Sequence, residues 1–205
     1  MTLRIGRAAA FLAAAVFAAP AYAHHAMDGE MPSTFFQGFV SGLAHPVIGI
    51  DHLAFIVAAG LIAAVTRMGI AAPIAFVVAS LAGVLLHLGA FDLPAVELLI
   101  ALSALGAGAA LALARTGAGR SVWLVAFAGA GIVHGYAFGE SIVGAEQTPL
   151  IAYLAGLAII QSALAVSVAG LASSRSWLPA DLQPRLAGAA AFGVGLTALV
   201  GNLAG

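Results

Sequence analysis

Long apolar stretches separated by short polar gaps dominate this sequence and restrict the folds that it can adopt. After residue 33 they run approximately over 34–66, 70–90, 94–114, 121–142, 149–171 and 185–204. A spanning helix needs about 20 apolar residues, and in lipid only helices and closed barrels pair all of their backbone groups. The sequence therefore predicts an all-α membrane protein with six transmembrane helices.

Composition removes several other classes of protein. Hydrophobic residues make up 63% and charged residues 7% of the chain, against about 25% charged in a soluble domain. Lysine is absent and the net charge is −1, so no basic surface for nucleic acid is expected. Without cysteine, imidazole and carboxylate are the strong metal ligands that remain.

The first residues have the pattern of a targeting segment. Two arginines precede apolar residues 8–19, and an Ala-Tyr-Ala cleavage site ends at Ala23. We expect a cleavable signal peptide over 1–23 and an extracytoplasmic tail over 24–33; the alternative is an uncleaved first span, for which the apolar run is short. The two histidines that open this tail either hold a metal loosely or belong to a plain polar segment.

The six-span domain is expected to cover 34–205, with its first block broken. This block is too long for one straight span, and it is interrupted near His45-Pro46. Proline removes a backbone donor and disfavours helix at the preceding residue. We expect a short helix, a break, and then a full span.

The arginines between the blocks predict the orientation. Arg67 lies in the first connection and Arg115 in the third, whereas Asp92 and Glu146 lie in the second and fourth. Short cytoplasmic loops retain Lys and Arg, so both ends of the mature chain are expected outside the cytoplasm. This predicts a protein of the bacterial inner membrane.

With this orientation, most ionisable residues inside the blocks fall in the external half. Burying a charged group in a bilayer costs at least ~2.5 kcal/mol, so such residues are functional candidates. Single members have simpler explanations, and His87 is either a ligand or a packing residue. As a set they predict a divalent transition-metal site, and nickel, cobalt and zinc all accept such ligands. The set is His45, Asp51, His52, His87, Glu97, His134 and Glu140.

The strongest motif is His-Pro-Val-Ile-Gly-Ile-Asp-His, from His45 to His52. On a straight helix these histidines would lie about 10.5 Å apart along the axis, too far to share an ion held at roughly 2 Å. Either the helix bends at Pro46 to Gly49, or His45 serves another ion or stage. Asp51 could ligate directly or orient an imidazole.

A second motif surrounds His134. Glycines 131, 135 and 139 form a ridge that allows close helix approach in a bilayer, and Glu140 follows it. This helix is a candidate to form one side of the metal site. In the next block, Gln161 is expected to make a hydrogen bond between helices.

At these motifs the chain resembles the HupE/UreJ family of nickel and cobalt permeases of hydrogenase and urease maturation. The resemblance rests on His45, Pro46, Gly49, Asp51 and His52, on His134 to Ala137, and on Pro94 to Glu97. It implies nickel or cobalt as the transported ion, and hydrogenase or urease maturation proteins as partners. The chain departs from the family at Phe138, where many members have a histidine, and at Glu140, which falls one position early.

The leading hypothesis is therefore uptake of nickel or cobalt through a permease that is not an enzyme. Two alternatives stay open. One is an intramembrane zinc hydrolase that acts on a lipid, although no H-E-x-x-H or G-x-S-x-G motif is present. The other is an accessory subunit that binds metal without transporting it.

Overall fold

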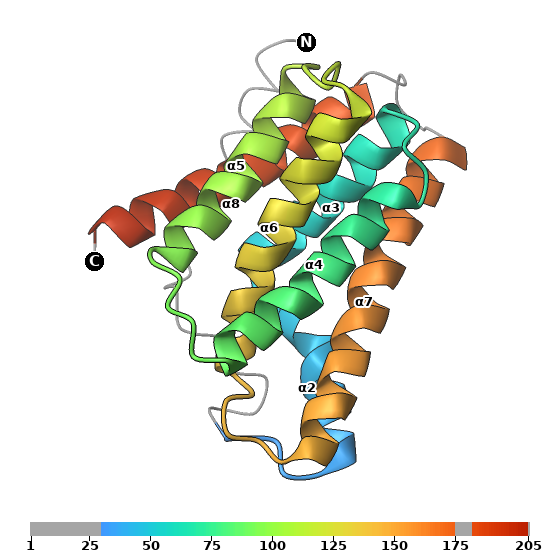
Figure 1. Cartoon of the computed structure of the whole chain (residues 1–205). Helices are drawn as coiled ribbons and strands as arrows, with labels where there is room; N and C mark the ends of the chain where they lie inside the picture. The colour runs from blue at the N-terminus through green and yellow to red at the C-terminus, as the bar shows by residue number, and fades with distance from the viewer. Residues whose placement is uncertain (1–29, 175–181, 205) are drawn as a thin grey trace, which may run out of the picture.

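The computed structural model describes residues 30–174 and 182–204, which form seven α-helices and no β-strand (Figure 1). The expected signal peptide and the two histidines after it lie outside the described residues. The helices are α2 (Phe35–Ile48), α3 (Ile50–Val65), α4 (Ala71–Leu88), α5 (Val96–Ala112), α6 (Arg120–Glu140), α7 (Gln147–Ser174) and α8 (Leu182–Ala204).

Four of these helices, α4, α6, α7 and α8, are long and apolar enough to cross a bilayer. The pair α2 and α3 passes the same criterion as one broken span, with a bend of 78° between its halves. Helix α5 has 17 residues, or about 25 Å, against roughly 30 Å of hydrocarbon core. The helices thus agree with a multi-pass membrane protein of four or five spans, and the count of six stays a prediction.

The broken span starts at a capping box and bends at a glycine. The Gln37 N–H donates to the Thr34 hydroxyl, and the Thr34 N–H donates to the Gln37 side chain, each at 3.2 Å. Helix α2 ends at Gly49, whose N–H donates to the His45 carbonyl and whose ψ of 99° turns the chain. The Gly49 carbonyl then accepts from Leu53 and starts α3.

The bend lies three residues beyond Pro46. His45 and Pro46 are both inside α2, because a proline there removes only the hydrogen bond to the Gly42 carbonyl. Pro46 is buried on the same face as Gly42, so its ring extends a packed surface. At Gly49, by contrast, a Cβ would lie 2.5 Å from Cδ2 of His52. The break in the first apolar block is confirmed, and it lies at Gly49, the far end of the segment from Pro46 to Gly49 where a bend was expected.

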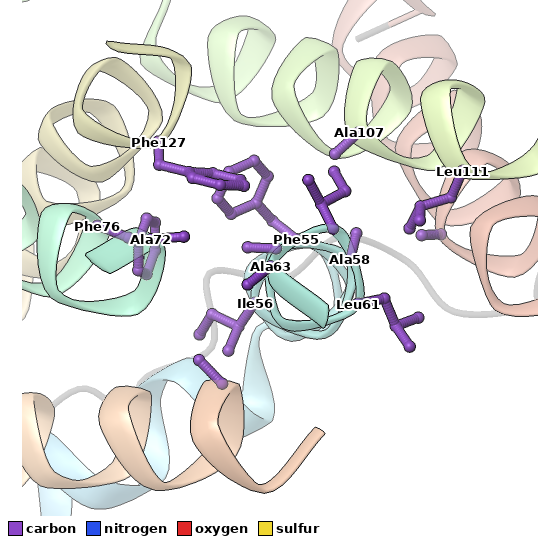
Figure 2. Close-up of a cluster of buried hydrophobic side chains, with 14 of the residues drawn as sticks. Phe55, Ile56, Ala58, Leu61, Ala63, Ala72, Phe76, Ala107, Leu111 and Phe127 are labelled. Atoms are coloured by element: carbon purple, nitrogen blue, oxygen red, sulfur yellow. The ribbon is translucent and has the colours of Figure 1, made fainter. Parts of the chain in front are cut away.

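Helix α3 is the centre of the bundle, with α4, α5, α6, α7 and α8 around it (Figure 2). Phe55 of α3 lies 5.2 Å from Phe76 of α4 and 6.4 Å from Phe127 of α6, measured between ring centroids. Leu111 of α5 and Ile56 of α3 are also buried. Because α3 is surrounded, the polar residues at its start face other helices instead of lipid.

Glycines bring α4 and α6 into close contact. Gly131, Gly135 and Gly139 all lie against α4, and a Cβ on Gly135 would clash with the backbone of Ser80. This confirms the expected glycine ridge. Close approach through glycine also joins α2 to α7 and α5 to α8. The α4–α6 contact fixes the depth of the residues beside the ridge, including His134.

The connection from α4 to α5 is tied to α6 by a tyrosine. The Tyr136 hydroxyl donates to the Phe91 carbonyl at 2.7 Å and accepts from the Leu93 N–H at 3.3 Å. Residues 89–95 run along the side of the bundle before α5 begins (Figure 1). Ala95, with φ of 55°, is the N-cap residue of this helix. Helix α5 is short for this reason, and its first turn carries Glu97.

The connections alternate between the two ends of the bundle (Figure 1). Segments 66–70 and 113–119 lie at one end, here called the Arg67 end. Segment 141–146 lies at the opposite end, here called the Glu140 end. This alternation agrees with the expected topology, and the assignment of the Glu140 end to the outside stays a prediction.

Candidate metal centre

The bend at Gly49 brings the two histidines of the first motif together. His45 is on α2 and His52 is on α3, and their ring centroids are 6.4 Å apart with the planes at 78°. On a straight helix the same residues would be separated by about 10.5 Å along the axis. The missing Cβ of Gly49 makes this possible, because the His52 ring occupies the space that a Cβ would need.

A third histidine meets this pair from α6. The Nδ1 atoms of His52 and His134 are 2.7 Å apart, which is a hydrogen bond between two imidazoles. His134 has no exposed surface and His52 has 7%. One proton must therefore lie between the two nitrogens, since two lone pairs at this distance would repel.

The other partners of His134 decide which ring supplies that proton. The Ser103 hydroxyl donates to the Ile100 carbonyl at 2.7 Å and lies 2.8 Å from Nε2 of His134. With its single proton used, Ser103 accepts from the Nε2–H of His134. Nδ1 of His134 then carries a lone pair and accepts from the Nδ1–H of His52. This order leaves the lone pair of His52 on Nε2.

His45 is held by two hydroxyl groups. The Tyr153 hydroxyl and the Ser141 hydroxyl each lie 3.1 Å from Nδ1 of His45. The tyrosine donates to the Phe138 carbonyl at 2.7 Å, and the single proton of the serine hydroxyl is directed to that carbonyl or to the tyrosine oxygen, each at 3.2 Å. The two hydroxyls thus fix the orientation of the His45 ring, and its tautomer sets which of the groups at Nδ1 donates.

Aromatic side chains pack against these histidines. Phe138, which is fully buried, has its ring centroid 5.2 Å from that of His45 and 4.3 Å from that of His52. Phe55 and Phe76 lie 4.8 and 5.8 Å from His134 on the other side. An apolar surrounding favours neutral imidazole, which is the form that binds metal.

Three carboxylates surround the approach to the histidines. Oδ1 of Asp51 accepts the backbone N–H of His52 at 2.8 Å, so Asp51 stabilises the first turn of α3, where a negative charge is also favoured by the helix dipole. The charges of Asp51 and Glu140 both act on Glu97, which lies in the first turn of α5. Glu97 and Glu140 are exposed, and the group can attract cations.

His87 lies apart from the other three histidines. Its ring packs on Tyr136 with centroids 4.4 Å apart, and its Cβ faces Gly139. Nδ1 of His87 is buried and has no hydrogen-bond partner within the described residues. The arrangement fits a packing residue at the outer part of the α4–α6 contact.

The structure thus brings six of the seven candidates into two neighbouring groups. Within residues 30–174 and 182–204, no three His, Asp or Glu side chains are already arranged to hold one ion. The hydroxyls that fix the rings were missed by sequence reasoning, because serine and tyrosine in apolar helices carry no spacing signal. They are Ser103, Ser141 and Tyr153.

A bundle of apolar helices of spanning length, with a broken helix that presents imidazoles to a neighbour, defines a polytopic membrane protein with a candidate metal centre. The family model described as HupE / UreJ protein matches residues 12–198. The chain therefore belongs to the HupE / UreJ family, and this confirms the resemblance seen in its motifs.

Family membership gives the chain a nickel- or cobalt-related transport or accessory function in the membrane. A search of curated proteins and of solved structures found no match.

Proposed function

We propose that this chain takes up nickel or cobalt ions across the bacterial inner membrane, from the Glu140 end to the Arg67 end. The observation that carries the proposal is the position of His52. Its ring centroid lies 6.4 Å from that of His45 and 4.8 Å from that of His134. One imidazole is thus shared by two neighbouring pairs, which suits a stepwise transfer.

In the first step, the acidic group attracts the hydrated cation. Asp51, Glu97 and Glu140 carry negative charge at one end of the bundle, close enough to act on one another. A mouth lined by one sign of charge raises the local concentration of the opposite ion. Oxygen ligands also hold divalent ions less firmly than imidazole in this part of the metal series, so the ion can move on.

In the second step, the ion exchanges water for imidazole. An ion about 2 Å from an imidazole nitrogen lies about 3 Å from the ring centre. Two rings with centres 6.4 Å apart can be bridged after a small movement. The hydroxyls that lie 3.1 Å from Nδ1 of His45 orient its ring for this bond.

In the third step, His52 passes the ion to His134. The hydrogen bond between their Nδ1 atoms is 2.7 Å long, and the His52 ring must turn away with its Nδ1–H so that the Nδ1 lone pair of His134 can bind the ion. His134 is fully buried, so an ion bound to it has left the aqueous phase. Partial dehydration by imidazoles also favours ions that accept nitrogen ligands over Mg²⁺ and Ca²⁺.

Uptake by purified protein in liposomes tests the proposal. We expect labelled nickel or cobalt to enter vesicles that contain the wild-type chain, and His52→Ala to reduce the initial rate at least tenfold. Thr197→Val is the matched control, because the Thr197 hydroxyl bonds to a carbonyl of its own helix, α8. Binding without uptake by the wild type would instead indicate an accessory subunit.

The hydrolase alternative predicts a different result. A zinc hydrolase needs a metal-bound water and turns over a substrate, whereas a permease changes only the position of the ion. Incubation of the zinc-loaded protein with membrane lipids, followed by analysis of the lipids, separates the two. We expect no cleavage product above that of protein-free vesicles.

A further inference from the structure

A second polar group is buried in the bundle outside the histidine centre. Ser80 of α4 and Gln161 of α7 are both fully buried, and the Gln161 amide N–H donates to the Ser80 hydroxyl at 3.0 Å. This confirms the expected hydrogen bond between helices. The amide carbonyl oxygen, Oε1, is also buried but accepts no hydrogen bond from any described residue. A buried acceptor without a donor is costly, and such groups often mark a bound water or ion.

Ser80 of this pair lies against α6, the helix that carries His134. Ser80 packs against Gly131 and against Gly135, the residue that follows His134 on α6. Ser80 and His134 are therefore at similar depth, on the two helices that the glycine ridge brings together. Gln161 lies one turn before Ala165, which contacts Gly60 of α3. The polar pair thus lies between α4 and α7, beside the central helix.

Apolar residues separate this pair from the Glu140 end. Val84 is one turn beyond Ser80, and Leu157 is one turn before Gln161. Both are fully buried in one hydrophobic cluster. An ion or water could reach the pair from this end only past them, whereas the side next to His134 already carries the candidate centre.

The direct way from His134 to the Arg67 end is blocked by aromatic rings. Phe55 packs on Phe76 and on Phe127 (Figure 2), and its ring centroid lies 4.8 Å from that of His134. A polar route must use other groups, and few exist. The buried polar side chains of the described residues are Ser41, His52, Ser80, His134 and Gln161.

We propose that Ser80 and Gln161 form an oxygen-donor site that receives the ion from His134 before its release toward the Arg67 end. This inference rests on the proposed function, and it uses two of the five buried polar residues that the described part of the chain contains. The Gln161 carbonyl and the Ser80 hydroxyl oxygen would each supply a lone pair, with water completing the coordination.

The change of ligand type suits release. Nickel and cobalt bind imidazole more firmly than a neutral amide or hydroxyl oxygen. An ion on Ser80 and Gln161 is therefore held weakly, and conduction requires binding that is weak enough for the ion to leave. The exchange is a substitution of ligands and needs no oxidant, reductant or group transfer.

Gln161→Met tests the site by separating binding from uptake. Methionine keeps the length of the side chain and removes both polar atoms. We expect equilibrium binding of cobalt to purified protein to stay within threefold of the wild type, and the initial rate of cobalt uptake into liposomes to fall at least tenfold. Ser80→Ala should reduce uptake in the same direction by a smaller factor. Ser173→Ala, on the same helix as Gln161, is the control.

The opposite results overturn the inference. If Gln161→Met takes up cobalt at the wild-type rate, or loses cobalt binding and uptake together, the pair is only a packing bond. If Gln161→Met does not fold, Gln161→Glu decides. If the pair binds the ion, the added carboxylate should hold a second cobalt ion on each chain and slow uptake. If the pair is only a packing hydrogen bond, one cobalt ion per chain is expected. Wild-type vesicles that admit no cobalt or nickel would overturn the proposed function itself.

Discussion

His52 and His134 meet across the contact between α3 and α6, with their Nδ1 atoms 2.7 Å apart and both rings buried. The two residues are far apart in sequence, and a different feature of the fold brings each of them to the contact. His52 follows the bend at Gly49, whereas His134 lies beside the glycine ridge that holds α6 against α4. Their meeting gives the candidate centre a buried pair of nitrogen atoms.

The two imidazoles should act as one unit. We expect His52→Ala and His134→Ala each to lower nickel affinity at least tenfold, and the double variant to lose little more than either single one, because contacting residues are not additive. Isothermal titration of the three purified variants measures this. Losses that add fully on a logarithmic scale would show that the two rings do not bind the same ion.

Gly49→Ala should displace the His52 ring without adding or removing a ligand. A Cβ at this position would lie 2.5 Å from Cδ2 of His52. We expect nickel affinity to fall about tenfold, as for other changes in the groups that orient a ligand. Gly106→Ala in α5 is the matched control, because nothing lies within 4 Å of its added Cβ. Equal affinity in both variants would contradict this role of Gly49.

Tyr153→Phe should weaken metal binding although Tyr153 need not touch the ion. The hydroxyl is one of two that lie 3.1 Å from Nδ1 of His45, and loss of such a partner costs about 10–100-fold in metal affinity. We expect about tenfold for the single variant and a larger loss when Ser141→Ala is added. Affinity is measured by titration, and the melting temperature reports whether the fold is kept.

A Tyr153→Phe variant with wild-type affinity but a lower melting temperature would assign the hydroxyl to stability alone. Thr197→Val provides the control, since it removes a hydroxyl that bonds to the Gly193 carbonyl, within α8.

Phe138→His should add a third ligand to the outer pair. The Phe138 ring lies 5.2 Å from His45 and 4.3 Å from His52 between centroids, so an imidazole there is within reach of an ion that bridges them. We expect nickel affinity to rise at least tenfold and uptake to slow, because a tightly bound ion leaves slowly. Titration and liposome uptake measure the two effects. Phe138→Leu should not raise the affinity.

His87→Ala decides between the two interpretations of that residue. Its ring packs on Tyr136 with the centroids 4.4 Å apart, and its Cβ faces Gly139. We expect nickel affinity to change less than threefold and the melting temperature to fall, because a buried ring contact is lost. A loss of affinity as large as that of His52→Ala would make His87 a ligand.

Much of the fold could be predicted because a bilayer allows few structures. Apolar blocks of spanning length predicted the helices, and glycines 131, 135 and 139 predicted the face of α6 that meets α4. The broken first span was also predicted. Its break was predicted between His45 and Gly49 and lies at Gly49, because local rules give proline a penalty but do not show which face is packed. The close approach of the His52 ring to Gly49 fixes the bend.

The candidate site was predictable as a set of residues and not as an arrangement. His45, His52 and His134 stand out as ionisable groups in apolar helices. Ser103, Ser141 and Tyr153, which fix the ring nitrogens, resemble ordinary packing residues in sequence. Hydrogen-bond partners on other helices have no fixed spacing, so no local pattern could identify them.

The sequence by itself determined the membrane class, the helices and the family, because hydrophobicity and short motifs are properties of single segments. Only the tertiary structure decided which histidines meet. It turned α2 against α3 by 78° at Gly49, set His52 against His134, and left His87 apart on Tyr136. The physical reason is that contacts between helices depend on crossing geometry, and this is fixed by all the packed faces together.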